Sequence, residues 1–309
     1  MPKIVVTGAA GLVGQNLLPR LRASAGTRVV AIDKNEHNLA ILSRLHPDVD
    51  ARLADLAQPG SWEDALVDCD TLVVCHAQIG GLRPEEFVRN NVTATERLMA
   101  EARAKGVRYV VNISSSVVNS MAKDNYTETK KAQEAAIKAS GIPQVVLRPT
   151  LMFGWFDRKH LGWLARFMKR VPIFPIPGSG RYMRQPLYAG DFCAIVAAAI
   201  ERRIEGEYNI SGLERIDYID LMRAVRRATR SRTAIVLIPF GLFQAMLGAA
   251  ALVAKDPPFT SAQLTALATP DEFEVIDWPR LFGVRPTPLN EALDATFNDP
   301  VYSDIVLQF

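Results

Sequence analysis

The stretch Lys3-Ile-Val-Val-Thr-Gly-Ala-Ala-Gly-Leu-Val-Gly14 decides the fold class of this 309-residue chain. It begins as a short apolar, β-branched run typical of a buried parallel strand, and it breaks directly into glycines. Gly8 permits a sharp turn, Gly11 lets the backbone approach a pyrophosphate, and Gly14 lets the following helix pack on the strand. That helix presents unpaired N–H groups and a positive dipole end to phosphates. The stretch therefore predicts a dinucleotide-binding turn.

An acidic residue ends the second predicted strand. Asp33 lies nineteen residues after Gly14, where a carboxylate accepts a hydrogen bond from a ribose 2′-hydroxyl. A 2′-phosphate would be repelled there, so the sequence favours NAD over NADP, although Lys34 leaves some tolerance for NADP open. An exposed acid without a ligand is the alternative interpretation. Asp55, after the third predicted strand, is placed to accept a hydrogen bond from the adenine amino group.

The composition limits the class of protein. Hydrophobic residues make up 49% of the chain and charged residues 22%, as in a soluble globular protein. A net charge of +3 is too small to indicate nucleic-acid binding. The three cysteines show no C-x-x-C spacing and the four histidines form no metal-ligand pattern, so we expect reduced thiols and no metal. The first strand begins almost at the first residue, which leaves no room for a signal peptide and favours a cytoplasmic location.

Strand and helix patterns alternate through the first half of the chain, which predicts an α/β fold with a doubly wound parallel sheet. We expect residues 1–150, joined by 187–210, to form a dinucleotide-binding domain, and residues 151–186 and 211–309 a smaller C-terminal substrate lobe. The proline- and glycine-rich stretch 171–180 is expected to be a loop. The predicted strands are 4–6, 28–33, 51–56, 70–77, 109–114, 144–149 and 207–210, and the predicted helices 12–21, 39–45, 62–67, 84–105, 125–140 and 187–200.

A second cluster suggests catalysis. Tyr126 and Lys130 are four residues apart, so they project from one face of a helix about one turn apart. A nearby ammonium stabilises a phenolate, and we therefore predict that Lys130 lowers the pKa of Tyr126 below its usual value of about 10. The serine run 114–116 ends the preceding strand and would hold a substrate oxygen. A solvated helix with an incidental Tyr and Lys is the alternative interpretation.

Together these motifs resemble the extended short-chain dehydrogenases/reductases, the NAD-dependent epimerase/dehydratase family, whose sheet is a Rossmann fold. The resemblance covers roughly residues 3–230. It rests on the cofactor turn 7–14, the N-V-x-G-T-like segment 91–95, the Leu-Arg-Pro at 147–149, the R-D-F-V-Y-V-x-D-like segment 184–191 and the strand segment 206–212.

The resemblance implies a role for each matching residue. Tyr126 would be the general acid/base, and Lys130 would activate it and bind the nicotinamide ribose. Ser116 would orient the substrate, with Ser115 as second choice. Arg184 would grip a diphosphate, unless it only forms a surface salt bridge. The implied cofactor contacts are Gly8, Gly11, Leu12, Val13, Gly14, Asp33, Asp55, Leu56, Ala77, Asn91, Ser114, Lys130 and Pro149, and the implied substrate contacts are Ser115, Ser116, Tyr126, Met152 and Arg184.

Several departures from the family pattern bear on the substrate. The interval from Ser116 to Tyr126 is short, the serines replace the T-D-E of dehydratases, and no asparagine follows Pro149. His76 falls one place later than the family's usual histidine and is expected to line the pocket wall. The chain is thus expected to be an NAD(H)-dependent oxidoreductase or epimerase acting on a secondary alcohol or ketone, foremost of a nucleotide-linked sugar.

Two other functions stay open. The missing asparagine and an apolar tail suit a hydrophobic alcohol such as a sterol or isoprenoid. Segments near residues 259–264 and 284–293 resemble an accessory subunit of respiratory complex I, which would make the chain a non-catalytic NAD(P)-binding protein. The retained pair Tyr126 and Lys130 favours an enzyme over that scaffold.

The apolar tail is residues 234–254, twenty-one residues without a charge after a run of arginines. Pro239, Gly241 and Gly248 interrupt it, so a strand followed by a helix from Phe240 is favoured over a membrane span. We expect it to form buried core or a dimer surface, with peripheral membrane contact as the alternative. The family pattern also implies a homodimer formed through the helices 84–105 and 125–140.

Overall fold

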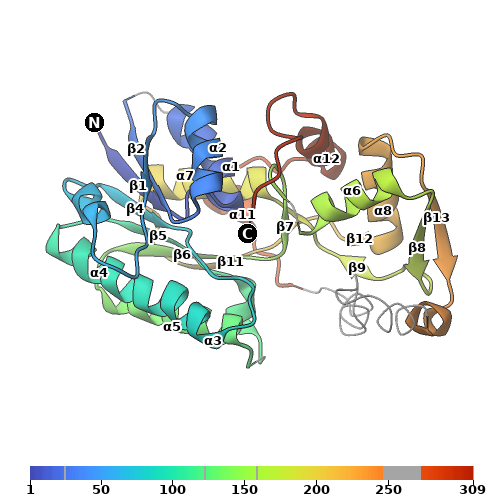
Figure 1. Ribbon diagram of the computed structural model, residues 1–309, viewed down its shortest axis with the longest axis horizontal. Helices are drawn as coiled ribbons and strands as arrows, with labels where there is room; N and C mark the ends of the chain where they lie inside the picture. The colour runs from blue at the N-terminus through green and yellow to red at the C-terminus, as the bar shows by residue number, and fades with distance from the viewer. Residues whose placement is uncertain (24–25, 122, 158, 246–272, 309) are drawn as a thin grey trace.

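Seven parallel strands form the central sheet of the computed structural model, which describes residues 1–23, 26–121, 123–157, 159–245 and 273–308. The strand order is β11-β6-β5-β4-β1-β2-β3, so the chain runs outward from β1 first in one direction and then in the other (Figure 1). This arrangement confirms the predicted doubly wound α/β fold. The strands are β1 (Lys3–Thr7), β2 (Arg28–Asp33), β3 (Asp50–Leu53), β4 (Thr71–Val74), β5 (Val110–Ile113), β6 (Gln144–Pro149) and β11 (Gly206–Ile210).

Helices cover both faces of the sheet. Successive side chains of each strand point to opposite faces, and both sets are buried. Val6 and Val73 pack against α1 and α7, whereas Val5 and Leu72 pack against the layer of η1, α4 and α5. A parallel sheet buried on both faces explains the nearly continuous apolar strand sequences. The helical segments are α1 (Leu12–Ala23), α2 (Glu36–Leu45), η1 (Ser61–Leu66), α3 (Pro84–Phe87), the π-helical η2 (Val88–Thr93), α4 (Ala94–Ala104), η3 (Ser116–Asn119), α5 (Asn125–Ala139), α7 (Ala189–Arg202) and α11 (Trp278–Phe282).

Strand β11 joins the sheet beside β6 through a three-residue ion-pair cluster. Arg148 of β6 donates to both carboxylate oxygens of Glu134 in α5, at 2.9 and 2.6 Å, and to Glu207 of β11 at 2.6 Å. The two carboxylates raise the pKa of Arg148, which stays charged. The bidentate contact with Glu134 joins β6 to α5, and the contact with Glu207 joins β6 to β11.

The remaining elements gather beside the central sheet (Figure 1). They enclose a separate apolar core. Phe153, Phe174, Met222 and Leu293 are buried in it. The predicted loop 171–180 is wrong in part, because residues 173–177 pair as a strand and their alternate side chains enter this core. The elements are β7 (Met152–Phe153), α6 (Leu161–Arg170), β8 (Ile173–Pro177), β9 (Met183–Arg184), β10 (Leu187–Tyr188), β12 (Ile216–Asp217), α8 (Tyr218–Ala228), β13 (Ala234–Ile238) and α12 (Leu289–Asn298).

The described part of the apolar tail is a strand and a helical turn, as predicted. β13 spans the first five residues, and residues 240–245 are helical. The buried-core expectation is wrong for this part, since Val236 and Leu237 are 41% and 48% exposed, while the alternative of a dimer surface stays a prediction. Residues 246–254 lie outside the described residues. Among the residues the structure describes, no helix is long and apolar enough to cross a membrane.

Replacing Gly14 by alanine should destabilise the fold, because a Cβ there would lie 2.3 Å from the Ala9 carbonyl oxygen. We expect the free energy of unfolding to fall by about 1–3 kcal/mol, the usual cost of overpacking, and urea denaturation measures it. Gly241→Ala is the matched control, since nothing lies within 4 Å of a Cβ at that position. Equal stabilities of the two variants would show that Gly14 is not needed for close packing.

Candidate active site

The glycine turn after β1 lies directly against the segment that follows β4. Gly8 has a φ of +63°, and a Cβ on it would stand 2.6 Å from the Cα of His76. The Gly11 N–H closes the turn by donating to the Gly8 carbonyl at 3.1 Å. Glycine at position 8 is therefore required both by the left-handed backbone and by the close approach. Since α1 starts at Leu12 and Val13, its N-terminus opens onto this turn.

The Asp33 carboxylate joins the same turn. One of its oxygens accepts from the Ala10 N–H and the other from the Asn35 N–H, both at 2.9 Å. Burial raises the pKa of Asp33, and these backbone hydrogen bonds partly oppose that rise. The glycine turn beside Asp33 fits a dinucleotide. Its phosphates would lie at the N-terminus of α1, and a ribose would lie at the Asp33 carboxylate.

The other predicted cofactor contacts vary in their accessibility. Asp55 forms an ion pair with Arg89 at 2.6 Å, a partner from η2 that sequence reasoning missed. Leu56 and Pro149 are buried, and Leu56 belongs to the core on the α4 and α5 face. Ala77 is half-buried in the segment after β4. All of these residues follow or end strands at the carboxyl edge of the sheet.

Asn91 is fully buried, and its side-chain amide holds the segment after β4 through hydrogen bonds. Its side-chain oxygen accepts from the Gln78 N–H at 2.6 Å, and its amide nitrogen donates to the Gln78 carbonyl at 3.1 Å and to the Thr129 hydroxyl at 2.9 Å. The amide thus joins the segment after β4 to α5. Its side chain is occupied by protein groups, so any effect on a cofactor acts through that segment.

The Tyr126 hydroxyl meets the serine run at the end of β5. Asp124 caps α5 by accepting from the Thr127 N–H at 2.9 Å, which places Tyr126 in the first turn of the helix. Burial raises the pKa of Tyr126, while a side-chain hydrogen bond with Ser115 lowers it. The structure thus places Ser115, the second choice, beside the phenol, and the role of Ser116 stays a prediction. Ser114 is buried, and its hydroxyl finds no partner among the described residues.

Lys130 does not lower the pKa of Tyr126, so that expectation is wrong. The Lys130 side chain is 1% exposed, and its ammonium donates to the Ile113 carbonyl at 3.1 Å and to the side-chain oxygen of Gln133. Burial lowers the pKa of Lys130 to about 8. Loss of hydration governs both groups, since burial disfavours the charged form of each.

His76 links the glycine turn to the helices around Lys130. Its two ring nitrogens contact the hydroxyls of Thr7 at 2.8 Å and Thr95 at 3.0 Å. Gln133 donates to the His76 carbonyl at 3.2 Å and to the Thr95 hydroxyl at 3.0 Å. Burial lowers the pKa of His76 to about 3, so the ring is neutral. His76 therefore belongs to a buried polar network. The sequence signal for it was the presence of polar residues, such as Thr95 and Gln133, on the helix faces that turn toward the sheet.

The predicted substrate residues outside the sheet lie on short strands. Arg184, in β9, donates to the Met183 carbonyl at 2.8 Å, and its guanidinium carbon lies 5.9 Å from the centre of the Tyr218 ring. Met152 opens β7 and is half-buried. The contact of Arg184 with a diphosphate stays a prediction.

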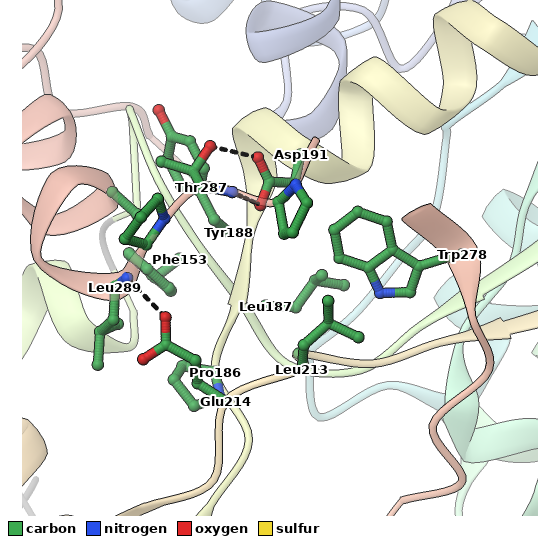
Figure 2. Close-up of a pocket in the computed structure, with 14 residues that line it drawn as sticks. Phe153, Pro186, Leu187, Tyr188, Asp191, Leu213, Glu214, Trp278, Thr287 and Leu289 are labelled. Atoms are coloured by element: carbon green, nitrogen blue, oxygen red, sulfur yellow. Dashed lines mark hydrogen bonds between the residues drawn. The ribbon is translucent and has the colours of Figure 1, made fainter. Parts of the chain in front are cut away.

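A separate pocket of about 220 Å³ lies between the start of α7 and the C-terminal helices (Figure 2). Its carboxylates are already engaged: Asp191 accepts from the Thr287 N–H and hydroxyl at 2.9 and 2.6 Å, and Glu214 accepts from the Leu289 N–H at 2.8 Å. None of the predicted catalytic side chains lines it. No cluster of three or more metal-ligating side chains occurs in the part of the chain that the structure describes.

Comparison with known proteins identifies the class. The NAD dependent epimerase/dehydratase family matches residues 4–211, so this chain belongs to that family. It is an oxidoreductase or epimerase of the short-chain dehydrogenase/reductase type, and NAD is its cofactor.

Individual relatives differ in what they act on. The chain is 23% identical to the ceramide reductase of Caulobacter vibrioides, over 76% of this chain and 73% of the relative. It is 27% identical to the 4-hydroxy-2-methyl-3-oxo-4-farnesyl-3,4-dihydroquinoline-1-oxide ketoreductase of Stigmatella aurantiaca, over 65% of each chain. The UDP-glucuronic acid 4-epimerase of Bacillus cereus, solved with NAD, has a similar fold, with a TM-score of 0.71 at 20% identity over 95% of this chain and 94% of that one.

Gln133→Leu should destabilise the chain, because it leaves the buried Lys130 ammonium with fewer acceptors. The expected loss is about 1–3 kcal/mol in the free energy of unfolding at neutral pH, the cost of an unsatisfied buried polar group. Gln133→Glu restores an acceptor and adds a negative charge, so it should raise the pKa of Lys130 above about 8.

Urea denaturation measures the stabilities, and the pH dependence of NAD binding reports the titration. Lys131→Met, on the exposed side of the same helix, is the control and should change stability by less than about 0.5 kcal/mol. Equal losses in Gln133→Leu and Lys131→Met would mean that Gln133 does not hold the ammonium.

Proposed function

We propose that this chain interconverts a ketone and a secondary alcohol with NAD(H), and that Tyr126 is its proton donor and acceptor. The observation that carries the proposal is the hydrogen bond between Tyr126 and Ser115 at the carboxyl edge of the sheet. The glycine turn and Asp33 lie at the same edge. Bound NAD(H) supplies the hydride exchange with the substrate carbon.

Burial raises the pKa of Tyr126, which bears on the protonation state of the phenol. A phenol whose pKa lies above its usual value of about 10 is protonated at neutral pH and can give its proton to the oxygen of a ketone. In the oxidising direction, Tyr126 must first lose its proton before it can accept one from the alcohol. In the ligand-free chain the phenol therefore carries its proton, and burial makes its phenolate, once formed, a stronger base.

Ser115 and Lys130 support the same proton transfer. The Ser115 hydroxyl, held beside the phenol, is placed to orient the substrate oxygen toward Tyr126. Lys130, fixed by the Ile113 carbonyl and Gln133, places a donor group beneath the end of β5. We retain its proposed contact with the nicotinamide ribose, because its ammonium lies on the same helix one turn after Tyr126.

For the substrate we propose a hydrophobic, lipid-like ketone or alcohol. Two relatives support this class, since one is named a reductase of ceramide and the other a ketoreductase of a farnesyl-bearing molecule. The chain also lacks the family's asparagine after Pro149 and the acid that dehydratases use. The sequence expectation of a nucleotide-linked sugar thus becomes the second candidate, supported by the likeness in fold to the UDP-glucuronic acid epimerase and by Arg184.

The expected homodimer, the cytoplasmic location and the division into a dinucleotide-binding domain and a substrate lobe are retained as proposals. The two helical segments expected to form the dimer, residues 84–104 and α5, do pack against each other in this structure. Light scattering after gel filtration measures the assembly directly.

Tyr126→Phe should reduce turnover by about 10²–10⁴-fold, the usual contribution of a general acid/base, while the affinity for NADH stays within a few-fold. Ser115→Ala should also lower kcat, because the hydrogen bond to the phenol is lost. Ser116→Ala is the matched control and should leave turnover nearly unchanged. Steady-state kinetics with fluorescence titration of NADH separates the two effects; a larger loss in Ser116→Ala than in Ser115→Ala would reverse the assignment of the serines.

A ligand panel distinguishes the two substrate classes. In the presence of NAD(H), long-chain ketones and alcohols should raise Tm and support changes in NADH absorbance, whereas UDP-, GDP- and dTDP-sugars should do neither. The reason is that Arg184 is occupied by the Met183 carbonyl and the Tyr218 ring. Stabilisation by a nucleotide sugar, lost in Arg184→Ala, would establish the second candidate instead.

A further inference from the structure

One end of the molecule exposes large apolar side chains on the two-stranded sheet of β8 and β13 and the helical turn that follows. Figure 1 places these two strands at the end of the long axis farthest from the N-terminus. We call this surface the apolar end face. It consists of Ile173 and Val236 on the two strands and Phe240 and Leu242 in the helical turn, which are 36–55% exposed.

The register of β8 and β13 explains why one side of this small sheet is exposed to solvent. Ile173 pairs with Ala234, and Val236 pairs with Pro175, so these four residues share one side of the sheet. The alternate residue Phe174 is buried in the core on the other side. A strand that is apolar on both sides, with only one side buried, leaves an unpaired hydrophobic surface.

Basic residues gather at the edge of this face where the chain enters its two strands. Segments 159–184 and 221–245 carry six and five Lys or Arg residues respectively, and neither contains an Asp or Glu. The Ser231 hydroxyl donates to the Met168 carbonyl at 2.8 Å, and the Ala234 N–H donates to the Pro172 carbonyl at 2.8 Å. These bonds bring together the two segments that lead into β8 and β13. The exposed cations at this entry are Lys169, Arg170, Arg227, Arg230 and Arg232.

We propose that the apolar end face docks on an anionic phospholipid bilayer. Apolar side chains that enter the headgroup region gain by leaving water, and a rim of Lys and Arg is attracted to acidic lipid headgroups. The whole chain carries a net charge of only +3, so the concentration of positive charge around this one face is a local feature. The apolar centre of the face would enter the acyl-chain boundary, and the cationic residues beside it would contact the anionic headgroups.

Two other occupants fit less well. A second copy seated on this face would bring two cationic rims together, and like charges in apposition oppose association. A nucleic acid would match the rim but not the apolar centre. The proposal goes beyond the proposed function, because docking does not depend on which substrate is used or on whether Tyr126 is catalytic.

Co-sedimentation of the full chain with vesicles tests the proposal. We expect binding to phosphatidylcholine vesicles that contain phosphatidylglycerol, weaker binding at high salt, and little binding to phosphatidylcholine alone. The double variant Val236→Ser/Phe240→Ser should lower the partition coefficient by about tenfold or more. Arg230→Gln/Arg232→Gln should lower it mainly at low salt, where surface charges are least screened.

Matched controls lie away from the apolar end face, one on β3 of the central sheet and one on α4. Leu53→Ser removes an equally exposed apolar side chain from β3, and Arg103→Gln removes an exposed cation from α4. Neither should change vesicle binding. Thermal melts confirm that each variant is folded, and NADH turnover in solution is measured separately, so failure of docking and failure of the proposed function are distinguishable.

Four results would overturn the proposal. These are no vesicle binding by the full chain, equal binding to neutral vesicles, unchanged binding in Val236→Ser/Phe240→Ser, or equal losses in the two control variants. A concentration-dependent dimer abolished by the same double variant would assign the face to a second copy. Binding to duplex DNA that displaces the vesicles would assign the rim to nucleic acid.

Discussion

The close approach of the Gly8 turn to the backbone of His76 is the constraint on which the site depends. No Cβ fits between them, so the turn after β1 and the segment after β4 are in direct contact. This contact lets the His76 ring reach Thr7 on one side and Thr95 on the other. Gln133 continues the network to the ammonium of Lys130. The glycine turn and α5 are thus joined through one set of buried hydrogen bonds.

Burial decides the charge state of this site more strongly than neighbouring charges do. Desolvation lowers the pKa of Lys130 and of His76, and it raises the pKa of Tyr126. Each shift favours the neutral form, as expected where water is excluded. A neutral phenol with a serine partner suits proton donation to a ketone, and this agrees with relatives that are named as reductases.

The second apolar core carries the features on which the proposed substrate class and the proposed docking surface rest. Arg184 contacts a carbonyl and the Tyr218 ring, and β13 turns one apolar side outward within a cationic rim. A bilayer surface would supply a hydrophobic substrate at the same place where the protein docks. The reaction and the docking surface would then be two parts of one adaptation, although each has its own test.

Sequence alone determined the features that follow from local spacing. Three glycines at intervals of three predict the turn, alternating apolar patterns predict the doubly wound sheet, and Tyr126 and Lys130 four residues apart predict one helix face. Tertiary structure alone decided that Ser115 lies beside the phenol, that the pKa of Tyr126 rises, and that one side of β13 is exposed. The physical reason is that solvent exclusion and contacts between distant segments depend on how the elements pack, whereas secondary-structure periodicity is written within a few consecutive residues.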